Sequence, residues 1–240
     1  MANVPAVELV PGVYRIPTAP WSLVNSFAFV EDDGRITLVD TGTKGAPKKI
    51  VTALEWMGSA PSQVTRIVLT HAHPDHAGGL ATMADRSGAP VTAHEQDAPA
   101  LRDGRSPGRD HTTFGGRLLE RMPGERFMPA EVAEEIVDGQ LLDIAGGLEV
   151  IHTPGHTPGH VALLHRPTDV LITADSIFNV RGLRWSPAAL CTNFQLTKQT
   201  ATRLVEAEYS IAAFTHGPEI TDRPRDVIRD FLRRKGIATE

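Results

Sequence analysis

Three histidines and one aspartate, His71, His73, Asp75 and His76, occur within six consecutive positions of this chain. Imidazole nitrogens and carboxylate oxygens are ligands that proteins use for Zn²⁺. In an extended loop, side chains two residues apart project to the same side. His71 and His73 can therefore bind one ion, while Asp75 and His76 face a neighbouring position. Two zinc ions need more than these four ligands, so the sequence predicts further ligands elsewhere in the chain.

Three other residues of these types stand in suitable places. His156 lies in the segment Thr-Pro-Gly-His-Thr-Pro-Gly, residues 153–159, where prolines fix backbone angles and glycines allow a tight loop. Asp175 and His216 each follow a short apolar run that is typical of a strand. In α/β folds, ligands usually bind at the carboxyl ends of strands. These three residues are therefore the predicted additional ligands.

The elements that must position these side chains follow from the hydrophobic pattern. Short apolar runs separated by turn residues predict antiparallel strands first, with a hairpin at Asp33-Gly34, and then alternating helices and strands. The order predicts an α/β fold. The predicted strands are 7–10, 13–16, 26–30, 36–39, 66–69, 90–93, 148–151, 161–164, 170–173 and 211–214, and the predicted helices are 46–57, 80–84, 197–209 and 224–234.

Residues 98–129 break this order, because arginines, glycines and prolines interrupt any regular period. A segment of this length without clear elements is typical of an insert that covers a site. We therefore expect a lid, and keep open the alternative of a surface loop with a short helix at 117–122.

The HxHxDH box at residues 71–76, the TPGHTPG loop, and Asp175 and His216 behind their strands resemble, in this order, the metallo-β-lactamase superfamily. The resemblance covers roughly residues 40–216. It implies an αββα sandwich, here expected as a single domain over residues 1–240, with a two-metal site on one edge.

The resemblance also implies a role for each candidate ligand. His71, His73 and His156 would bind the first ion, while Asp75, His76 and His216 would bind the second. Asp175 would bridge both ions. Asp40, in the segment Asp-Thr-Gly, matches the carboxylate that orients the ligand loops of the family without touching metal.

Such a centre is a hydrolytic one. Two cations about 3.5–4 Å apart lower the pKa of a bridging water toward about 7, which creates a hydroxide nucleophile at neutral pH. We expect two Zn²⁺ per chain, with iron or manganese as alternatives. Asp75 is the expected catalytic residue, because its second carboxylate oxygen can pass a proton to the leaving group.

Departures from subfamily patterns narrow the substrate. Asp175 replaces the Ser or Cys typical of the β-lactamases, and Phe178 stands where the quorum-quenching lactonases have a Tyr. Glyoxalase II enzymes carry a sizeable C-terminal domain, whereas only residues 217–240 follow His216. We expect hydrolysis of a small carboxylic ester, lactone or thioester. The alternatives are a mononuclear iron oxidoreductase like the persulfide dioxygenases, a phosphodiesterase or nuclease, and a metal-binding module without catalysis.

Composition limits the partners. A net charge of −5 and a pI near 6.1 provide no general cationic surface for nucleic acid. The single cysteine, Cys191, cannot form an internal disulfide, and no apolar run approaches the roughly 18 residues of a membrane span. We expect a cytoplasmic enzyme with a small-molecule substrate, no nucleic-acid or membrane partner, and a homodimer left open. The other five histidines, expected to be structural or surface residues, are His94, His111, His152, His160 and His165.

Overall fold

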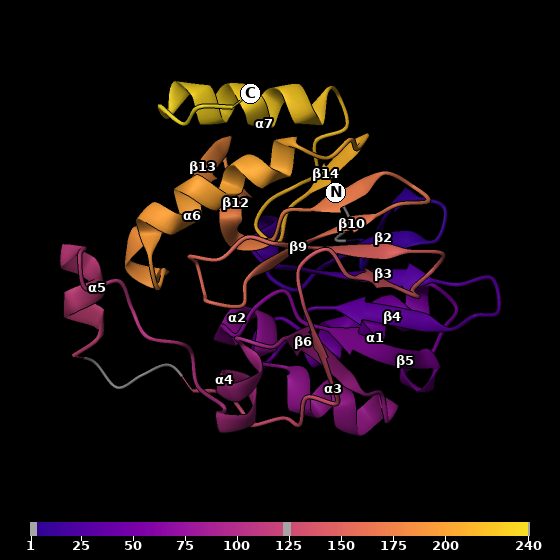
Figure 1. The fold of residues 1–240 in the computed structure, drawn as a ribbon. Coiled ribbons are helices and arrows are strands. Elements are labelled where there is room, and N and C mark those ends of the chain that lie inside the picture. The colour runs from indigo at the N-terminus through magenta and orange to yellow at the C-terminus, as the bar shows by residue number, and fades with distance from the viewer. Residues whose placement is uncertain (1–3, 122–125, 240) are drawn as a thin grey trace. The chain divides into compact units, whose positions relative to one another are not determined.

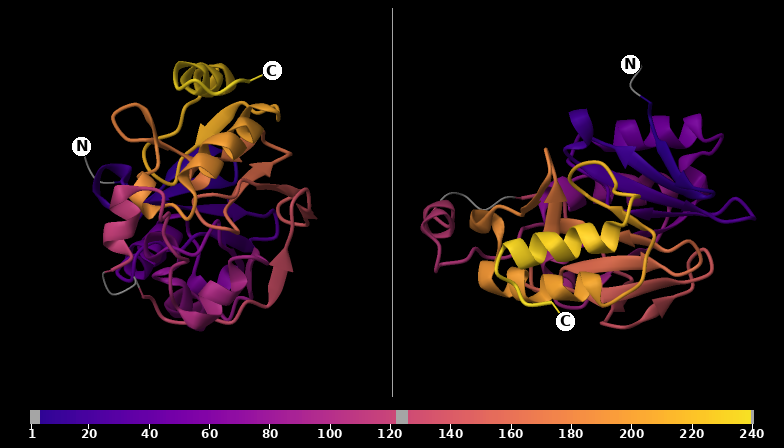
Figure 2. Two further views of the ribbon diagram at one scale, coloured as in Figure 1. Left: turned by 60° about the vertical axis from the view of Figure 1, so that its left-hand side comes forward. Right: turned by 90° about the horizontal axis from the view of Figure 1, so that it is seen from above.

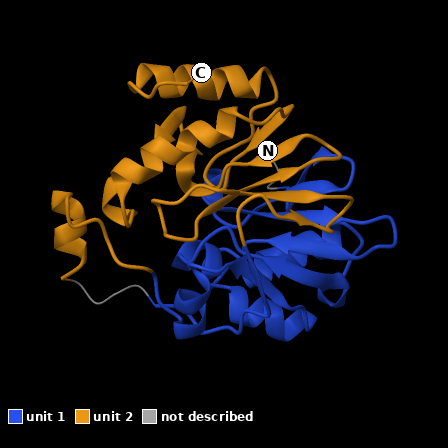
Figure 3. Cartoon of the chain, in the orientation of Figure 1, with its two compact units in different colours: residues 1–106, 125–136 blue, residues 107–124, 137–240 orange. Residues whose placement is uncertain are grey.

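The computed structural model describes residues 4–121 and 126–239. The chain falls into two compact units: unit 1 comprises residues 1–106 and 125–136, and unit 2 comprises residues 107–124 and 137–240 (Figure 3). Each unit has its own sheet and its own helices. The expectation of a single domain stays a prediction.

Unit 1 contains a seven-stranded sheet whose strands follow one another in sequence order, from β1 to β7 (Figure 1). The first four strands are antiparallel neighbours, and the strands from β4 onward are parallel. The strands are β1 Val7–Val10, β2 Val13–Pro17, β3 Asn25–Val30, β4 Ile36–Val39, β5 Val64–Val68, β6 Val91–His94 and β7 Glu134–Ile136, and the helices are α1 Pro47–Trp56, α2 Pro74–Ala77, α3 Leu80–Ser87 and α4 Ala98–Asp103.

Helices α1, α3 and α4 cover one face of this sheet. Ile50 and Leu54 of α1, Met83 of α3 and Leu101 of α4 form one buried cluster with apolar side chains of the strands, such as Ile67 of β5. The predicted strand, helix and strand at 36–39, 46–57 and 66–69 form a parallel crossover, because β4 and β5 pair in parallel on either side of α1. Parallel strands end at the same edge of a sheet, so the segments that leave β5 and β6 meet there.

Unit 2 contains a five-stranded sheet in the order β14-β11-β10-β9-β8, and a separate two-stranded ribbon of β12 and β13. Only β11 and β14 are parallel. The strands are β8 Leu141–Leu142, β9 Leu148–His152, β10 Val161–His165, β11 Val170–Ile172, β12 Ile177–Asn179, β13 Leu183–Trp185 and β14 Ile211–Ala213, and the helices are α5 Phe114–Leu119, α6 Phe194–Thr200 and α7 Pro224–Arg234.

The core of unit 2 lies between its larger sheet and two C-terminal helical segments. Helix α7 packs against the 3₁₀ turn Ala201–Val205 that follows α6 (Figure 2). Ile228 and Phe231 of α7 join Leu204 of that turn and the strand residues Leu164 and Leu171 in one buried cluster. This packing fixes the carboxyl ends of β11 and β14, from which Asp175 and His216 emerge.

The segment predicted as an insert divides between the two units. Its first part is α4 of unit 1, which ends at Gly104 in a left-handed conformation. Its middle part carries α5 at 114–119, three residues earlier than the predicted short helix, whose residue Met122 lies outside the described part of the chain. A lid role for 98–129 stays a prediction. Among the helices of the described residues, none has the length and apolar character needed to cross a bilayer.

Candidate metal centre

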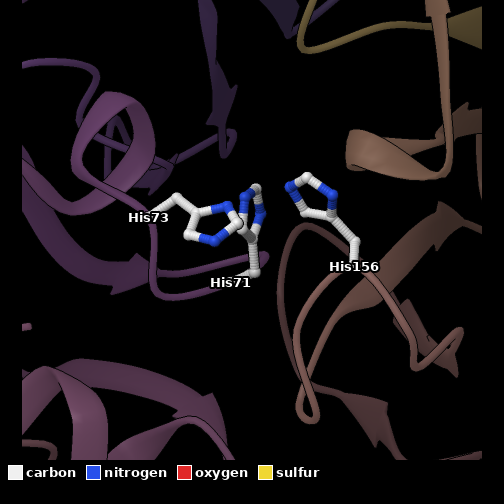
Figure 4. Close-up of side chains that lie close together, drawn as sticks. All are labelled: His71, His73 and His156. Atoms are coloured by element: carbon white, nitrogen blue, oxygen red, sulfur yellow. The ribbon is translucent and has the colours of Figure 1, made fainter. Parts of the chain in front are cut away.

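His71 and His73 lie in the loop that leaves the carboxyl end of β5. The peptide between them is held by Asp97, whose Oδ2 accepts a hydrogen bond of 2.8 Å from the Ala72 N–H. The two rings meet edge to face with their centroids 4.9 Å apart (Figure 4). Each offers a nitrogen within 4.8 Å of one on the other ring. The predicted projection of both rings to one side is therefore confirmed.

Asp75 and His76 stand on the single-turn helix α2, which Pro74 begins. Proline suits the first helical position, because its fixed φ is helical and its missing N–H has no partner there in any helix. The Asp75 carboxylate lies 3.7 Å from His76 Nε2, and its side chain is 38% exposed. His76 is fully buried, with its ring centroid 4.0 Å from that of His71. Unit 1 thus brings all four of its candidate ligands together.

Asp40 supports the candidate ligands of unit 1 through hydrogen bonds. The buried Asp40 carboxylate accepts hydrogen bonds from the Thr70 N–H at 2.8 Å, from Thr70 Oγ1 at 2.7 Å and from His76 Nδ1 at 2.8 Å. Its backbone φ is +58°, a left-handed conformation that aspartate tolerates better than most residues. The predicted orienting role of Asp40 agrees with these three contacts.

These contacts also fix which ring nitrogens carry protons. His76 Nδ1 must donate to the Asp40 carboxylate, so its Nε2 carries the lone pair. Thr70 Oγ1 gives its proton to Asp40 and therefore accepts from His71 Nδ1 at 3.0 Å, which leaves the His71 lone pair on Nε2 as well. A nitrogen lone pair is what a metal ion requires.

In unit 2, His156 lies in the predicted tight loop (Figure 4). Gly155 has φ +130°, and a Cβ at that position would lie 2.2 Å from the backbone nitrogen of Thr197 in α6. Only glycine permits this close approach. The approach lets the Asn193 N–H donate to the Gly155 carbonyl at 2.8 Å and the Thr192 N–H donate to the His156 carbonyl at 3.0 Å.

Asp175 lies between the two candidate ligand histidines of unit 2. Its Oδ2 lies 3.2 Å from Nε2 of His156 and 3.2 Å from Nε2 of His216, and its Oδ1 accepts a hydrogen bond of 2.7 Å from Thr215 Oγ1. His160 holds the backbone of Asp175, because its Nε2 accepts from the Asp175 N–H at 2.8 Å. This contact agrees with the structural role expected for His160.

The charge on Asp175 governs the protonation of His156 in the metal-free chain. Burial alone would lower the pKa of His156, but the hydrogen bonds with Asp175 and Cys191 raise it to about 9. Burial would likewise raise the pKa of the Cys191 thiol, yet its contact with His156 lowers it overall. The negative charge on Asp175 thus favours the protonated form of His156.

The donors of unit 2 fit a divalent ion better than they fit a proton. The Asp175 side chain is 3% exposed, and the carboxylate oxygen and two imidazole nitrogens converge there. A buried carboxylate is costly unless it is paired. Divalent cations would provide that pairing, and nitrogen and oxygen donors are those preferred by zinc, iron and manganese.

Some functional residues could not be recognised in the sequence. Asp97 and Cys191 each contact a ligand or its peptide from a distant part of the chain. Phe178 stacks on His216 with ring centroids 4.1 Å apart at 34°. Asp97 and Cys191 belong to no spaced motif, whereas Phe178 is marked in the sequence by its place three residues after Asp175.

Comparisons with known proteins cover both units. A model of the family described as "Metallo-beta-lactamase superfamily" matches residues 19–218. The protein YobT of Bacillus subtilis (strain 168) is 31% identical over 218 residues, which are 85% of this chain and 88% of YobT. The probable metallo-hydrolase YqgX of the same organism is 28% identical over 207 residues, 85% of this chain and 90% of YqgX.

Solved structures show the same architecture. A metallo-beta-lactamase family protein from Thermus thermophilus matches with a TM-score of 0.76 and 27% identity, over 95% of this chain and 81% of that one. The MIM-2 metallo-β-lactamase matches with a TM-score of 0.75 and 20% identity, over 97% of this chain and 89% of that one. These matches confirm the predicted fold class.

Proposed function

The chain belongs to the metallo-β-lactamase superfamily, and on that premise we propose that the ligands of its two units serve one two-metal centre. The family match spans both sets of ligands. The proposed ligands are His71, His73, Asp75, His76, His156, Asp175 and His216.

One observation carries the proposal. The first ion would be held by His71, His73 and His156, and the second by Asp75, His76 and His216. Asp175 Oδ2 is 3.2 Å from the metal-binding nitrogen of His156 and equally far from that of His216. A carboxylate placed evenly between ligands of two different ions is the arrangement expected of a bridging group.

We propose that the centre hydrolyses a small carboxylic ester, lactone or thioester. Bound divalent ions, two Zn²⁺ in this proposal, would supply Lewis acidity and a water of lowered pKa. Asp40 and Thr70 keep His71 and His76 in the tautomer that binds metal. Asp75 is the most exposed of the unit 1 ligands, so its second oxygen is accessible to hold a proton for the leaving group.

The wall of the site offers no phenol group at position 178 to assist the reaction. Phe178 covers one face of His216 and offers only an apolar ring, so proton transfer must come from another group. Asp75 is the proposed donor. Relatives such as YqgX, a probable metallo-hydrolase, agree with hydrolysis without indicating a substrate.

The competing function is a mononuclear iron oxidoreductase. Such a site uses two histidines and one carboxylate and leaves other positions open. The even placement of Asp175 between His156 and His216 favours two ions, and the fixed lone pair of His76 supplies a ligand that a single-ion site does not use.

Metal analysis and turnover together test the proposal. The purified protein should contain about two zinc ions per chain, have no visible absorption, and hydrolyse some members of a panel of p-nitrophenyl esters, lactones and thioesters. A chelator should abolish turnover, and added Zn²⁺ should restore it. Asp75→Asn should retain its metal but lose most of its kcat. About one iron per chain with oxygen uptake would contradict the hydrolase, and phosphodiester turnover alone would contradict the substrate class.

A further inference from the structure

We propose that Cys191 is a positioning residue for the metal-binding nitrogen of His156. This inference rests on the proposed function, because it concerns a ligand of that centre. The Cys191 Sγ lies 3.5 Å from His156 Nδ1 and the residue is fully buried. The other ring nitrogen, Nε2, faces Asp175 at 3.2 Å.

The geometry of the imidazole ring separates these two contacts. Nδ1 and Nε2 point away from one another, so an ion bound at Nε2 lies on the side of the ring that faces Asp175. The thiol lies on the opposite side. Cys191 therefore acts on the metal through His156, as the partner of its second nitrogen, and is not itself a ligand.

Its surroundings orient the sulfur as an acceptor. The thiol is within hydrogen-bonding distance of the Pro187 carbonyl, at 3.6 Å, and this carbonyl can only accept. A thiol that donates to Pro187 presents its sulfur lone pairs to the Nδ1–H of His156. The proton of the imidazole is thus kept on Nδ1, and Nε2 carries the lone pair that metal binding requires.

The same segment also holds the backbone of His156. The Thr192 N–H donates to the His156 carbonyl at 3.0 Å, so consecutive residues of one loop contact both the ring and the peptide of this ligand. The loop is itself fixed, because the Asp110 N–H donates to the Cys191 carbonyl at 2.7 Å and Arg109 donates to the Leu190 carbonyl at 2.7 Å.

Residues 109–110 therefore stabilise a loop of unit 2 by hydrogen bonds. Asp110 also accepts from the Phe194 N–H at 2.8 Å, at the start of α6. The segment thus holds both ends of the loop 190–194, which carries Cys191. A rigid support of this kind determines how well the partner of a ligand can orient that ligand.

Substitution of Cys191 tests the inference through metal affinity. Loss of an outer partner of a metal-binding histidine typically weakens binding by about 10–100-fold. We expect this loss in Cys191→Ala, measured by competition for Zn²⁺ with a chromophoric chelator. Cys191→Ser retains an acceptor at this position and should restore most of the affinity. Ser186→Ala is the matched control, because Ser186 is buried and contacts the same thiol at 3.5 Å.

A spectroscopic signature separates positioning from general packing. With Co²⁺ in place of zinc, the visible bands of Cys191→Ala should shift relative to the wild type, and those of Cys191→Ser and Ser186→Ala should not. The unfolding temperatures of the metal-free proteins should remain close to one another. Equal affinities and equal spectra for wild type and Cys191→Ala would overturn the inference, as would an equal loss in all three variants. A wild type that binds no metal would instead refute the proposed function.

Discussion

The two ligand sets are built in different ways. In unit 1, four proposed ligands occupy residues 71–76, so one loop and one helical turn carry them all. In unit 2, the proposed ligands are His156, Asp175 and His216, which come from three separate segments. The first set is arranged by local backbone geometry, and the second depends on the packing of β10, β11 and β14.

The two sets also differ in the carboxylate that organises each of them. Asp40 accepts three hydrogen bonds in unit 1 and is a dedicated support. Asp175 organises unit 2 and is itself a proposed ligand. The comparison teaches that the organising carboxylate of unit 1 is separate from the proposed ligands, whereas the organising carboxylate of unit 2 is itself one of them. Loss of the Asp40 carboxylate should therefore lower the stability of unit 1, and loss of the Asp175 charge should lower the affinity for metal.

The largest expected effect is that of Asp40→Ala on stability. The substitution leaves two buried donors on Thr70 and one on His76 without their acceptor, which should cost about 3–5 kcal/mol of unfolding free energy. Urea denaturation of the metal-free protein measures it, with Asp33→Ala, an exposed carboxylate in the β3–β4 turn, as the control. A loss below about 1 kcal/mol would show that Asp40 is not the support.

Asp175→Asn should affect metal binding more than folding. The amide keeps the shape of the side chain and can still accept from Thr215, but it loses the charge placed between His156 and His216. We expect Zn²⁺ affinity to fall by about 100-fold or more, with little change in the unfolding free energy of the metal-free protein. Isothermal titration and urea denaturation of the same samples separate the two effects. If the metal-free Asp175→Asn protein were unfolded, Asp175 would be needed for folding as Asp40 is, and the proposed difference between the two carboxylates would be wrong.

The smallest expected effect concerns the loop of His156. In Gly155→Ala, the new Cβ would meet the backbone of Thr197, so we expect a loss of about 2–3 kcal/mol together with weaker metal binding. Gly182→Ala is the matched control, because Gly182 also has positive φ, +98°, but no atom lies within 4 Å of the place that its new methyl group would occupy. It should cost only about 1 kcal/mol. Equal losses in the two variants would mean that backbone strain, and not the close approach, limits position 155.

Much of the secondary structure could be predicted from local pattern. Helix α7 has the predicted bounds, since Pro224 marks its start and Ile228, Phe231 and Leu232 recur at helical spacing. The helix predicted at 197–209 instead begins at Phe194, capped by Asn193, and changes to a 3₁₀ turn at Ala201. Apolar spacing alone does not distinguish these two kinds of helix.

Other elements left no usable pattern. Strands β12 and β13 have three residues each and pair only with one another, so neither has the alternation of a longer half-buried strand. Helix α4 carries Pro99 in its first turn, where proline is tolerated, although in the sequence this residue suggests a break.

The candidate ligands were predictable because metal chemistry selects residue types and spacing. The residues that hold these candidate ligands in place could not be predicted in this way. Asp97 lies 25 residues from Ala72, and Cys191 lies 35 residues from His156. Such pairs are brought together by tertiary packing, which a single sequence does not encode as a local pattern. His160 shows the converse, because it stands four residues from a ligand and yet supports a backbone N–H.

Because Cys191 is buried, the reaction of its thiol with a reagent reports the opening of the segment around it. Cys191 is the single cysteine of the sequence and is fully enclosed beside His156. A thiol reagent can therefore react only when the segment around residues 188–194 opens, and no second thiol contributes to the signal. When the loop closes faster than the reagent reacts, the labelling rate relative to that of an exposed thiol gives the opening free energy of this loop, so the dynamics beside His156 can be followed in the unmodified protein.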